Sequence, residues 1–178
     1  TPQTNYLNFF SVMATEDNTR INLSNNITSG LVIQNFGNNQ FPVENILLNK
    51  GDSYVVAAKV TDNNGTIINQ NRDGLIGTLV SSNKPVVVNC GSANGSFGNG
   101  GARDYGFDQI VGADKIGDEY IFVRGDGQDS YENILLVANQ DDTYVWINGS
   151  SSPINVDPIA AGEHIVIEGD AYEGSNLY

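Results

Sequence analysis

The feature that most constrains this chain is a pattern that occurs twice, in Phe10–Leu23 (FSVMATEDNTRINL) and in Ile134–Ile147 (ILLVANQDDTYVWI). At a constant offset of 124 residues, both stretches have an apolar run that ends in Ala, a polar cluster with Asp, a Thr and then alternating apolar residues. Alternation on either side of a short polar cluster is typical of two antiparallel strands joined by a tight turn. The sequence therefore predicts the same β-hairpin at two places.

A second match lies further along each copy. Asn49–Ala58 (NKGDSYVVAA) corresponds to Ala160–Gly169 (AAGEHIVIEG) at an offset of 111 residues, and each has a turn of Gly and an acidic residue followed by a strand. The extra length of the first copy falls around QNFGNNQFP, which we interpret as a loop insertion. Two matches in the same order, with the length difference in a loop, indicate a duplicated supersecondary unit.

Alternating and β-branched runs predict strands throughout the chain, and almost no segment has a helical period. The 24 asparagines and 20 glycines among 178 residues fit many tight turns, because both residue types tolerate a positive φ. We therefore predict an all-β, mainly antiparallel fold of two related β-sandwich-like units, with a propeller-like or barrel arrangement as the alternative. The predicted strands are 7–14, 19–24, 31–34, 54–60, 75–80, 85–90, 119–124, 133–138, 143–148 and 163–168.

We expect the first β unit to span residues 1–100 and the second 101–178, with a Gly-rich loop at 91–105 (GSANGSFGNGGARDY) at their junction. A functional loop and a plain linker are both consistent with that composition. The second copy is truncated at its C-terminal end, since it stops at EGSNLY, where the GTLV strand of the first copy would begin. Either the chain is a fragment of a longer protein, or strands from neighbours complete it, because open sheet edges pair readily with other chains.

The charge of the chain excludes several classes of partner. A net charge of −13, from 21 acidic and 8 basic residues, would be repelled by nucleic-acid phosphates and by anionic lipid surfaces. No apolar run approaches the length of a membrane-spanning helix. The acidic balance fits either simple solubility or cation binding. Cys90 is the single cysteine, so an internal disulfide is excluded, and its place after PVVVN predicts a small buried side chain.

Three stretches carry a family resemblance: Gly77–Ser96 (GTLVSSNKPVVVNCGSANGS), Asp108–Val123 (DQIVGADKIGDEYIFV) and the hairpin turns ATEDNT and ANQDDT. Together, from about Phe10 to Tyr178, the chain resembles the IgGFc-binding N-terminal domain family. Members of that family occur in a mammalian mucus protein that binds the Fc part of IgG. They also occur in large bacterial surface proteins, notably of the Bacteroidetes, often beside adhesive and gliding-associated modules.

The resemblance implies an extracellular adhesion or interaction role and supplies no catalytic residues. Mammalian members carry cysteines near the matching positions, whereas this chain keeps only Cys90, which favours a bacterial cell-surface member. The residues themselves also give no catalytic pattern: nothing in the spacing pairs Cys90 with His164, and neither a Gly-x-Ser-x-Gly elbow nor a P-loop lysine is present. We therefore expect that the chain is not an enzyme. The alternative is a carbohydrate-active enzyme with an Asp/Glu pair, because carboxylates are plentiful, although nothing in the sequence singles out two of them.

Aromatic side chains are the candidate ligand-binding residues, because they stack on sugars and anchor protein interfaces. Some of them flank or lie in the glycine-rich segment, where tethering of that loop to the core is an equally consistent role. Others alternate with Val145 and Ile147, and would form a pair on the outer face if those two residues face the core. The candidates are Phe97, Tyr105, Phe107, Tyr144 and Trp146.

Calcium is the one candidate cofactor. Hard oxygen ligands cluster in TEDNT, GDGQDSYE and NQDDT, and flexible Asp- and Asn-rich loops supply such ligands to Ca²⁺. The alternative is that these side chains only cap turns through their own backbone. The candidate metal ligands are Asp126, Asp129 and Asp141.

These observations predict an extracellular adhesion or interaction module of a larger bacterial surface protein, which binds a protein or glycan on another surface without catalysis. The alternative is a subunit of a surface fibre that is completed by strands from neighbouring copies. Self-association through open strand edges is a further expected contact, whereas nucleic acid and membrane insertion are not expected.

Overall fold

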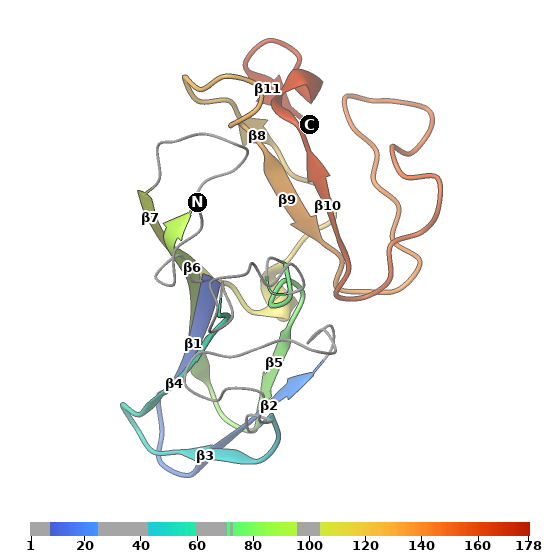
Figure 1. The fold of residues 1–178 in the computed structure, drawn as a ribbon. Helices are drawn as coiled ribbons and strands as arrows, with labels where there is room; N and C mark the ends of the chain where they lie inside the picture. The colour runs from blue at the N-terminus through green and yellow to red at the C-terminus, as the bar shows by residue number, and fades with distance from the viewer. Residues whose placement is uncertain (1–7, 25–42, 60–70, 72, 96–103) are drawn as a thin grey trace. The chain divides into compact units, whose positions relative to one another are not determined.

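Alternating apolar residues form antiparallel sheets in the computed structural model of this chain (Figure 1). The structure describes residues 8–24, 43–59, 71, 73–95 and 104–178. Within these residues there are strands and short 3₁₀ turns, and the strands form open sheets. The prediction of an all-β, mainly antiparallel fold is confirmed. The strand predicted at 31–34 lies outside the described residues.

The described residues divide into two units. The first contains the residues up to Gly95 together with Asp104–Val111, and the second contains Gly112–Tyr178. Residues 104–111, which the sequence placed in the second unit, cluster with the first because they carry a strand of its larger sheet. The strands of the first unit are β1 (Asn8–Ala14), β2 (Thr19–Ser24), β3 (Ile46–Leu48), β4 (Ser53–Ala57), β5 (Leu79–Ser82), β6 (Val86–Gly95) and β7 (Asp104–Ile110). The second unit has 3₁₀ turns at Ala113–Lys115 and Gly169–Ala171, and strands β8 (Phe122–Val123), β9 (Ile134–Val137), β10 (His164–Ile167) and β11 (Asn176–Leu177).

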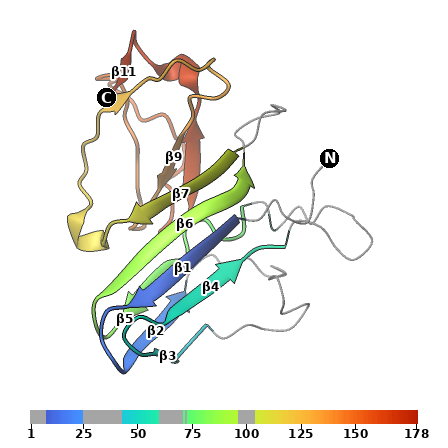
Figure 2. The same cartoon turned by 90° about the vertical axis from the view of Figure 1, so that its left-hand side faces the viewer.

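The first unit is sandwich-like. One sheet has the strand order β4-β1-β6-β7 and the other has the order β3-β2-β5 (Figure 2). Buried and exposed residues alternate along β2, as expected for a strand with one face on a core. Side chains of both sheets meet in one cluster, so the core lies between them. Its buried members are Phe10, Val12, Ala14, Ile21, Leu23, Ile46, Leu48 and Val56.

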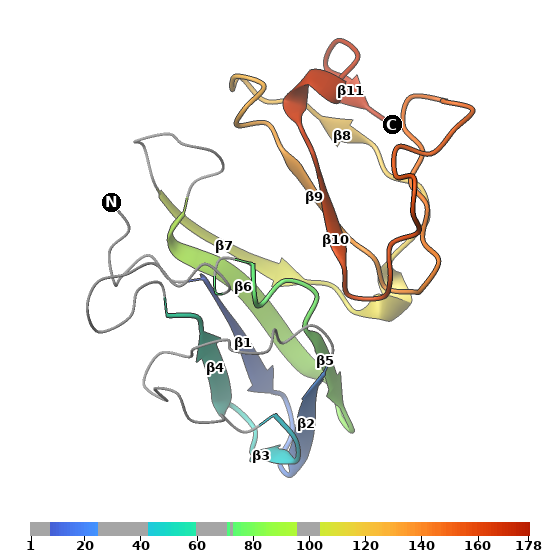
Figure 3. The ribbon, with the colours of Figure 1, turned by 45° about the vertical axis from the view of Figure 1, so that its right-hand side comes forward.

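The second unit has a smaller core. β9 pairs with β10 and β8 pairs with β11 in two antiparallel sheets of two strands (Figure 3). The buried side chains of this core are Ile134, Ile167 and Leu177. Two-stranded sheets are marginal alone, so packing of these apolar faces against each other supplies the stability that their few ladder bonds cannot.

The two units repeat the same strand pairing, as the duplication predicts. β1 pairs with β4 in the same register as β9 pairs with β10. Adding 124 to the number of a β1 residue from Phe10 to Met13, and 111 to the number of its partner in β4, gives a residue pair of β9 and β10. The corresponding pairs are Phe10–Val56 and Val12–Tyr54 in the first unit, and Ile134–Ile167 and Leu136–Ile165 in the second.

The turns repeat as well. The Ala14 N–H donates to the Asp52 carbonyl over 3.0 Å, and its counterpart Ala138 donates to the Glu163 carbonyl over 2.9 Å. The hairpin turns contain Asn18 at φ 57° and Asp142 at φ 58°. Asn and Asp tolerate this left-handed conformation better than other non-glycine residues do, which explains why the polar cluster survives in both copies.

Some strands differ from the prediction. The strand expected at 143–148 has only an isolated bridge between Thr143 and Ile159, whereas β3, β7 and β11 were not predicted. The predicted Gly-rich loop at 91–105 overlaps two strands, because β6 continues to Gly95 and β7 begins at Asp104. Glycine suits this part of β6, because the neighbouring backbone approaches closely and the ladder is irregular between Ser92 and Gly95.

Gly91 is the clearest example of this requirement. A Cβ atom built on Gly91 would collide with the backbone carbonyl oxygen of Gly106 on β7. A Cβ atom on Gly106 would meet no atom within 4 Å. The contact is with backbone, which cannot rotate away as a side chain would, so Gly91 has to remain glycine for β7 to pair with β6.

We expect Gly91→Ala to destabilise the first unit by about 1–3 kcal/mol, the usual cost of overpacking. Gly106→Ala is the matched control, and we expect it to change the free energy of unfolding by less than about 0.5 kcal/mol. Urea unfolding followed by circular dichroism measures both. Equal midpoints for the two variants would contradict the close approach of β7 to β6.

Candidate functional site

Three aromatic rings lie together on the outer face of the four-stranded sheet. Phe9 comes from β1, and Tyr105 and Phe107 come from β7. The ring centroids are 6.3 Å apart for Phe9 and Tyr105, 6.2 Å for Phe9 and Phe107, and 6.0 Å for Tyr105 and Phe107. The interplanar angles are between 18° and 27°, so the rings are stacked. We call Phe9, Tyr105 and Phe107 the aromatic platform.

The strand register explains this cluster. Phe9 lies opposite Gly91 on β6, and Gly91 lies opposite Phe107 on β7. Side chains directly opposite one another share a face of the sheet. Because Gly91 has no side chain, the space above it is left to the rings of the two flanking strands. Phe10 is buried in the core, so its neighbour Phe9 points to the outer face.

The platform is open to solvent, and the sheet around it is partly apolar. Tyr105 is 59% exposed and Phe107 is 52% exposed, although each carries a large apolar ring. Met13 and Val55 on the same face are also exposed. An exposed apolar face of this kind on a rigid sheet marks an interaction surface more often than a scattered single residue does.

The structure brings together two of the five predicted ligand-binding residues in this platform, Tyr105 and Phe107. Phe97 lies outside the described residues. Phe9 was not among the predicted residues, although one signal for it was present: the match of Phe10 with Ile134 puts Phe10 in the core and therefore puts Phe9 on the opposite face.

Tyr144 and Trp146 form a separate aromatic pair in the second unit. Their ring centroids are 6.1 Å apart at an angle of 50°, and both rings are exposed. Val145 and Ile147 pack against the core of this unit, so the aromatic pair lies on the outer face, as the alternation predicts. That these residues bind a ligand stays a prediction.

Two of the predicted metal ligands, Asp129 and Asp141, interact with different partners in the structure. The Asp129 carboxylate forms an ion pair with Arg124. Asp141 accepts a hydrogen bond from the Ala161 N–H over 2.9 Å. In the part of the chain that the structure describes, no group of three or more His, Cys, Asp or Glu side chains is placed to hold a metal ion. Calcium binding through Asp126, Asp129 and Asp141 stays a prediction.

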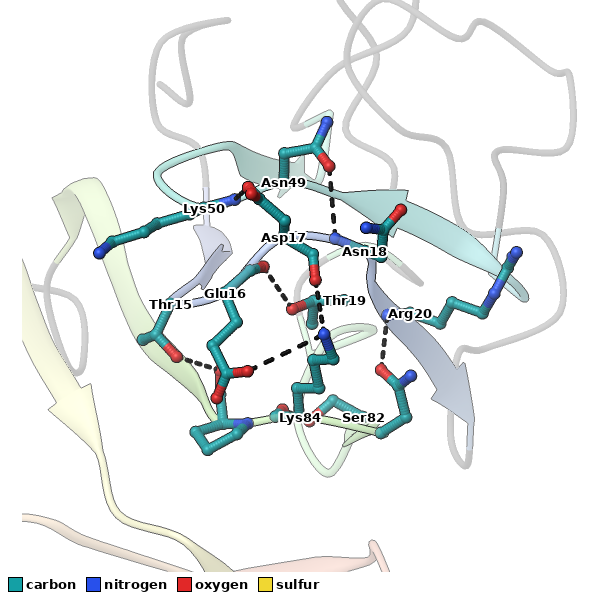
Figure 4. A network of polar contacts seen from close by, with 12 residues as sticks. Thr15, Glu16, Asp17, Asn18, Thr19, Arg20, Asn49, Lys50, Ser82 and Lys84 are labelled. Atoms are coloured by element: carbon teal, nitrogen blue, oxygen red, sulfur yellow. Dashed lines mark hydrogen bonds and ion pairs between the residues drawn. The ribbon is translucent and has the colours of Figure 1, made fainter.

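Asp17 in the first unit is the counterpart of Asp141 and forms the equivalent hydrogen bond. Figure 4 shows the polar network at this turn, where the Lys50 N–H donates to the Asp17 carboxylate over 3.0 Å. The Lys84 ammonium donates to the Asp17 carbonyl over 2.7 Å and lies 3.8 Å from Glu16. Asp17 and Asp141 therefore perform the same task, which is to hold a turn of the adjoining segment by accepting a backbone hydrogen bond.

Cys90 is a half-buried thiol on β6, opposite Asp108 of β7. It packs against the core of the first unit, which agrees with its expected role as a small apolar side chain. Burial raises the pKa of this thiol, and the negative charge of Asp108 raises the pKa further. Since the thiolate is the reactive form, this environment makes Cys90 a poor nucleophile.

Comparison with known proteins identifies the family. The family model described as IgGFc binding protein matches residues 1–175. The chain belongs to the IgGFc-binding family. This confirms the family resemblance that the motifs indicated. The family is one of binding or interaction modules. No curated protein and no solved structure matches the chain. Among the described residues, no helix has the length and apolar character needed to cross a membrane.

We expect Asp141→Ala to lower the free energy of unfolding of the second unit by about 1 kcal/mol, because the Ala161 N–H loses its acceptor. Trp146 is the single tryptophan, so its fluorescence follows this unit. Asp157→Ala is the control, and an exposed site of this kind should change little. Each melt is run in calcium chloride and in EDTA. A loss that appears only in calcium would contradict the backbone role and support the calcium prediction.

We expect iodoacetamide to alkylate Cys90 at pH 8 more slowly than it alkylates glutathione, because the raised pKa leaves less thiolate. Asp108→Asn removes the nearby negative charge and should speed the reaction by about two- to threefold, a small factor because an exposed charge is screened. Asp114→Asn, in the second unit, is the control. Mass spectrometry of the labelled fraction measures the rate, and a slower reaction in Asp108→Asn would reverse the assigned sign.

Proposed function

We propose that this chain is a non-catalytic adhesion module of a larger extracellular surface protein, and that it binds a protein partner through the aromatic platform of the first unit. The observation that carries the proposal is the stacking of Phe9, Tyr105 and Phe107 on an exposed sheet face. Family membership supports binding rather than chemistry as the task.

The geometry of the platform suits protein recognition. The three rings are held by β1 and β7, which belong to one four-stranded sheet, so little side-chain or loop entropy is lost when a partner orders them. Clustered aromatic residues at the centre of an interface contribute most of the binding energy in many complexes. Exposed Met13 and Val55 extend the apolar area on the same face.

The class of partner follows from charge and family. A chain with a net charge of −13 favours neutral or basic surfaces over acidic ones. The description of the family, IgGFc binding protein, makes the Fc fragment of immunoglobulin G the first probe to use. A glycan is the alternative partner, because stacked aromatic rings also bind sugar faces.

Attachment to a bacterial cell surface, of the Bacteroidetes type, is part of this proposal and rests on the single cysteine and the Asn- and Gly-rich composition. A surface-fibre subunit completed by strands from neighbouring copies is the second candidate. The observation that favours it is the segment of residues 143–148 in the second unit, the counterpart of β2, of which one edge lacks a neighbouring strand among the described residues.

We expect the double variant Tyr105→Ser, Phe107→Ser to lose binding by at least about tenfold, because two anchors of about 1–2 kcal/mol each are removed. The assay is surface plasmon resonance with immobilised Fc fragment, together with a glycan array. Both residues are exposed, so circular dichroism should show an unchanged fold. Phe9 is left intact, since it is partly buried against the sheet.

Two further variants make the assay specific. Leu47→Ser changes an exposed residue of β3, in the other sheet of the first unit, and should bind nearly as the parent chain does. Tyr144→Ser, Trp146→Ser removes the aromatic pair of the second unit and should leave binding intact. Loss of binding in this last variant alone would move the site to the second unit. Binding to glycans with no protein binding would contradict the proposed partner class.

A further inference from the structure

Residues 143–148 of the second unit are the counterpart of β2. One edge of this segment pairs with a neighbouring segment, as one edge of β2 pairs with β3. β2 pairs with β3 on one side, where Thr19 lies opposite Leu48. The counterpart pair, Thr143 and Ile159, forms a bridge. The Ile154 N–H also donates to the Val145 carbonyl over 2.8 Å. Residues 154–159 therefore take the place that β3 has in the first unit.

The other edge differs between the two units. In the first unit, β5 lies beside β2, with Asn22 opposite Ser81. Next to this pair, the Arg20 N–H donates to the Asn83 side chain over 2.7 Å, and the Asn83 N–H donates to the Arg20 carbonyl over 3.2 Å. The counterparts of Arg20 and Asn22 are Tyr144 and Trp146. Within the described residues, no hydrogen bond reaches the backbone N–H or C=O of either one.

The C-terminal residue lies at the start of this open edge. The Asn148 N–H donates to the Tyr178 carbonyl over 2.7 Å, and the Tyr178 N–H donates to the Asn148 side chain over 3.2 Å. Asn148 is the counterpart of Ser24, which lies opposite Leu79, the first residue of β5. Tyr178 thus occupies the place of Leu79. A strand that continued from Tyr178 would run antiparallel past Trp146 and Tyr144 without a connecting loop.

The core of the second unit is more exposed at the same place. Ile21 and Leu23 of β2 are 0% and 3% exposed. Their counterparts Val145 and Ile147 are only partly buried, although both pack on the core. In the first unit Val80 of β5 packs against the core beside Leu23. Among the described residues of the second unit, no apolar side chain packs on the core at that position, and an added strand would supply one.

We propose that the edge of residues 143–148 is a strand-accepting site, and that its occupant is an extended segment with the pattern of Val80–Asn83, which pairs with this edge in the antiparallel register that β5 adopts with β2. The first added residue is apolar and covers Ile147. The next two pair with Trp146 and Val145, and the fourth is an asparagine that caps Tyr144 as Asn83 caps Arg20. The site is separate from the aromatic platform, so it does not depend on binding through that platform. The fibre candidate uses the same edge, with a second copy as the occupant.

The test is a variant of the whole chain with Val-Ser-Ser-Asn-Lys, the sequence of residues 80–84, added after Tyr178. Amide hydrogen exchange is measured by NMR at Tyr144 and Trp146. We expect exchange at both amides to slow by at least about tenfold as they gain partners, and the Trp146 emission to shift to shorter wavelength. The control has Val-Pro-Ser-Pro-Lys added, because proline removes the donors that a ladder needs.

The experiment has two results that overturn the proposal. In the first, both amides exchange equally fast in the extended chain and in the proline control. In the second, the unextended chain protects these amides increasingly with concentration, and the added segment gives no further protection, so that the occupant is a second copy. Size-exclusion chromatography at the same concentrations separates the second result from the expected one, in which the extended chain protects both amides as a monomer.

Discussion

The antiparallel register between β1 and β4, repeated between β9 and β10, is the constraint on which the other features depend. A strand has a side-chain period of two, so a slip of one residue would exchange its inner and outer faces completely. The register places Phe10 and Val12 in the first core, and Ile134 in the second. The same register fixes which residues face outward, including Phe9 in the first unit. The position of the aromatic platform is therefore a consequence of core packing.

The aromatic platform depends on this register and on one glycine. Gly91 is the residue between Phe9 and Phe107 in the cross-strand row, and β7 can approach β6 there only because Gly91 lacks a Cβ atom. Any larger residue would both displace β7 and fill the space beneath the rings. Since β7 is an edge strand, its residues are otherwise free to diverge. The rings of Tyr105 and Phe107 at this edge stack with Phe9 but remain about half exposed, so much of their apolar area stays in contact with solvent.

Much of the fold could be predicted because the repeat is visible in the local alternation of apolar and polar residues. The hairpin of β1 and β2 and the pairing of β9 with β10 follow from alternation and from the positive-φ residues Asn18 and Asp142. The glycine-rich end of β6 could not be predicted, because glycine normally marks turns and only the approach of β7 makes it favourable in a strand here. β7 itself, DYGFDQI, is mostly polar on one face and lacks a clean apolar alternation. For the site, Tyr105 and Phe107 could be named as exposed aromatics, but their stacking with Phe9 depends on a pairing between distant strands.

The two units show which residue types the shared hairpin requires and which depend on the neighbouring strands. Ile21 and Leu23 correspond to Val145 and Ile147, so the inward positions stay apolar in both copies. The outward positions diverge: Arg20 and Asn22 lie beside β5, and the Asn22 side chain accepts a hydrogen bond from the Asn45 N–H over 2.8 Å. Tyr144 and Trp146 hold the same positions beside an edge that no described strand occupies. Their rings instead contact each other. Outward residues interact with cross-strand neighbours, so the divergence at these positions follows from the different surroundings of the two strands rather than from the hairpin that both copies share.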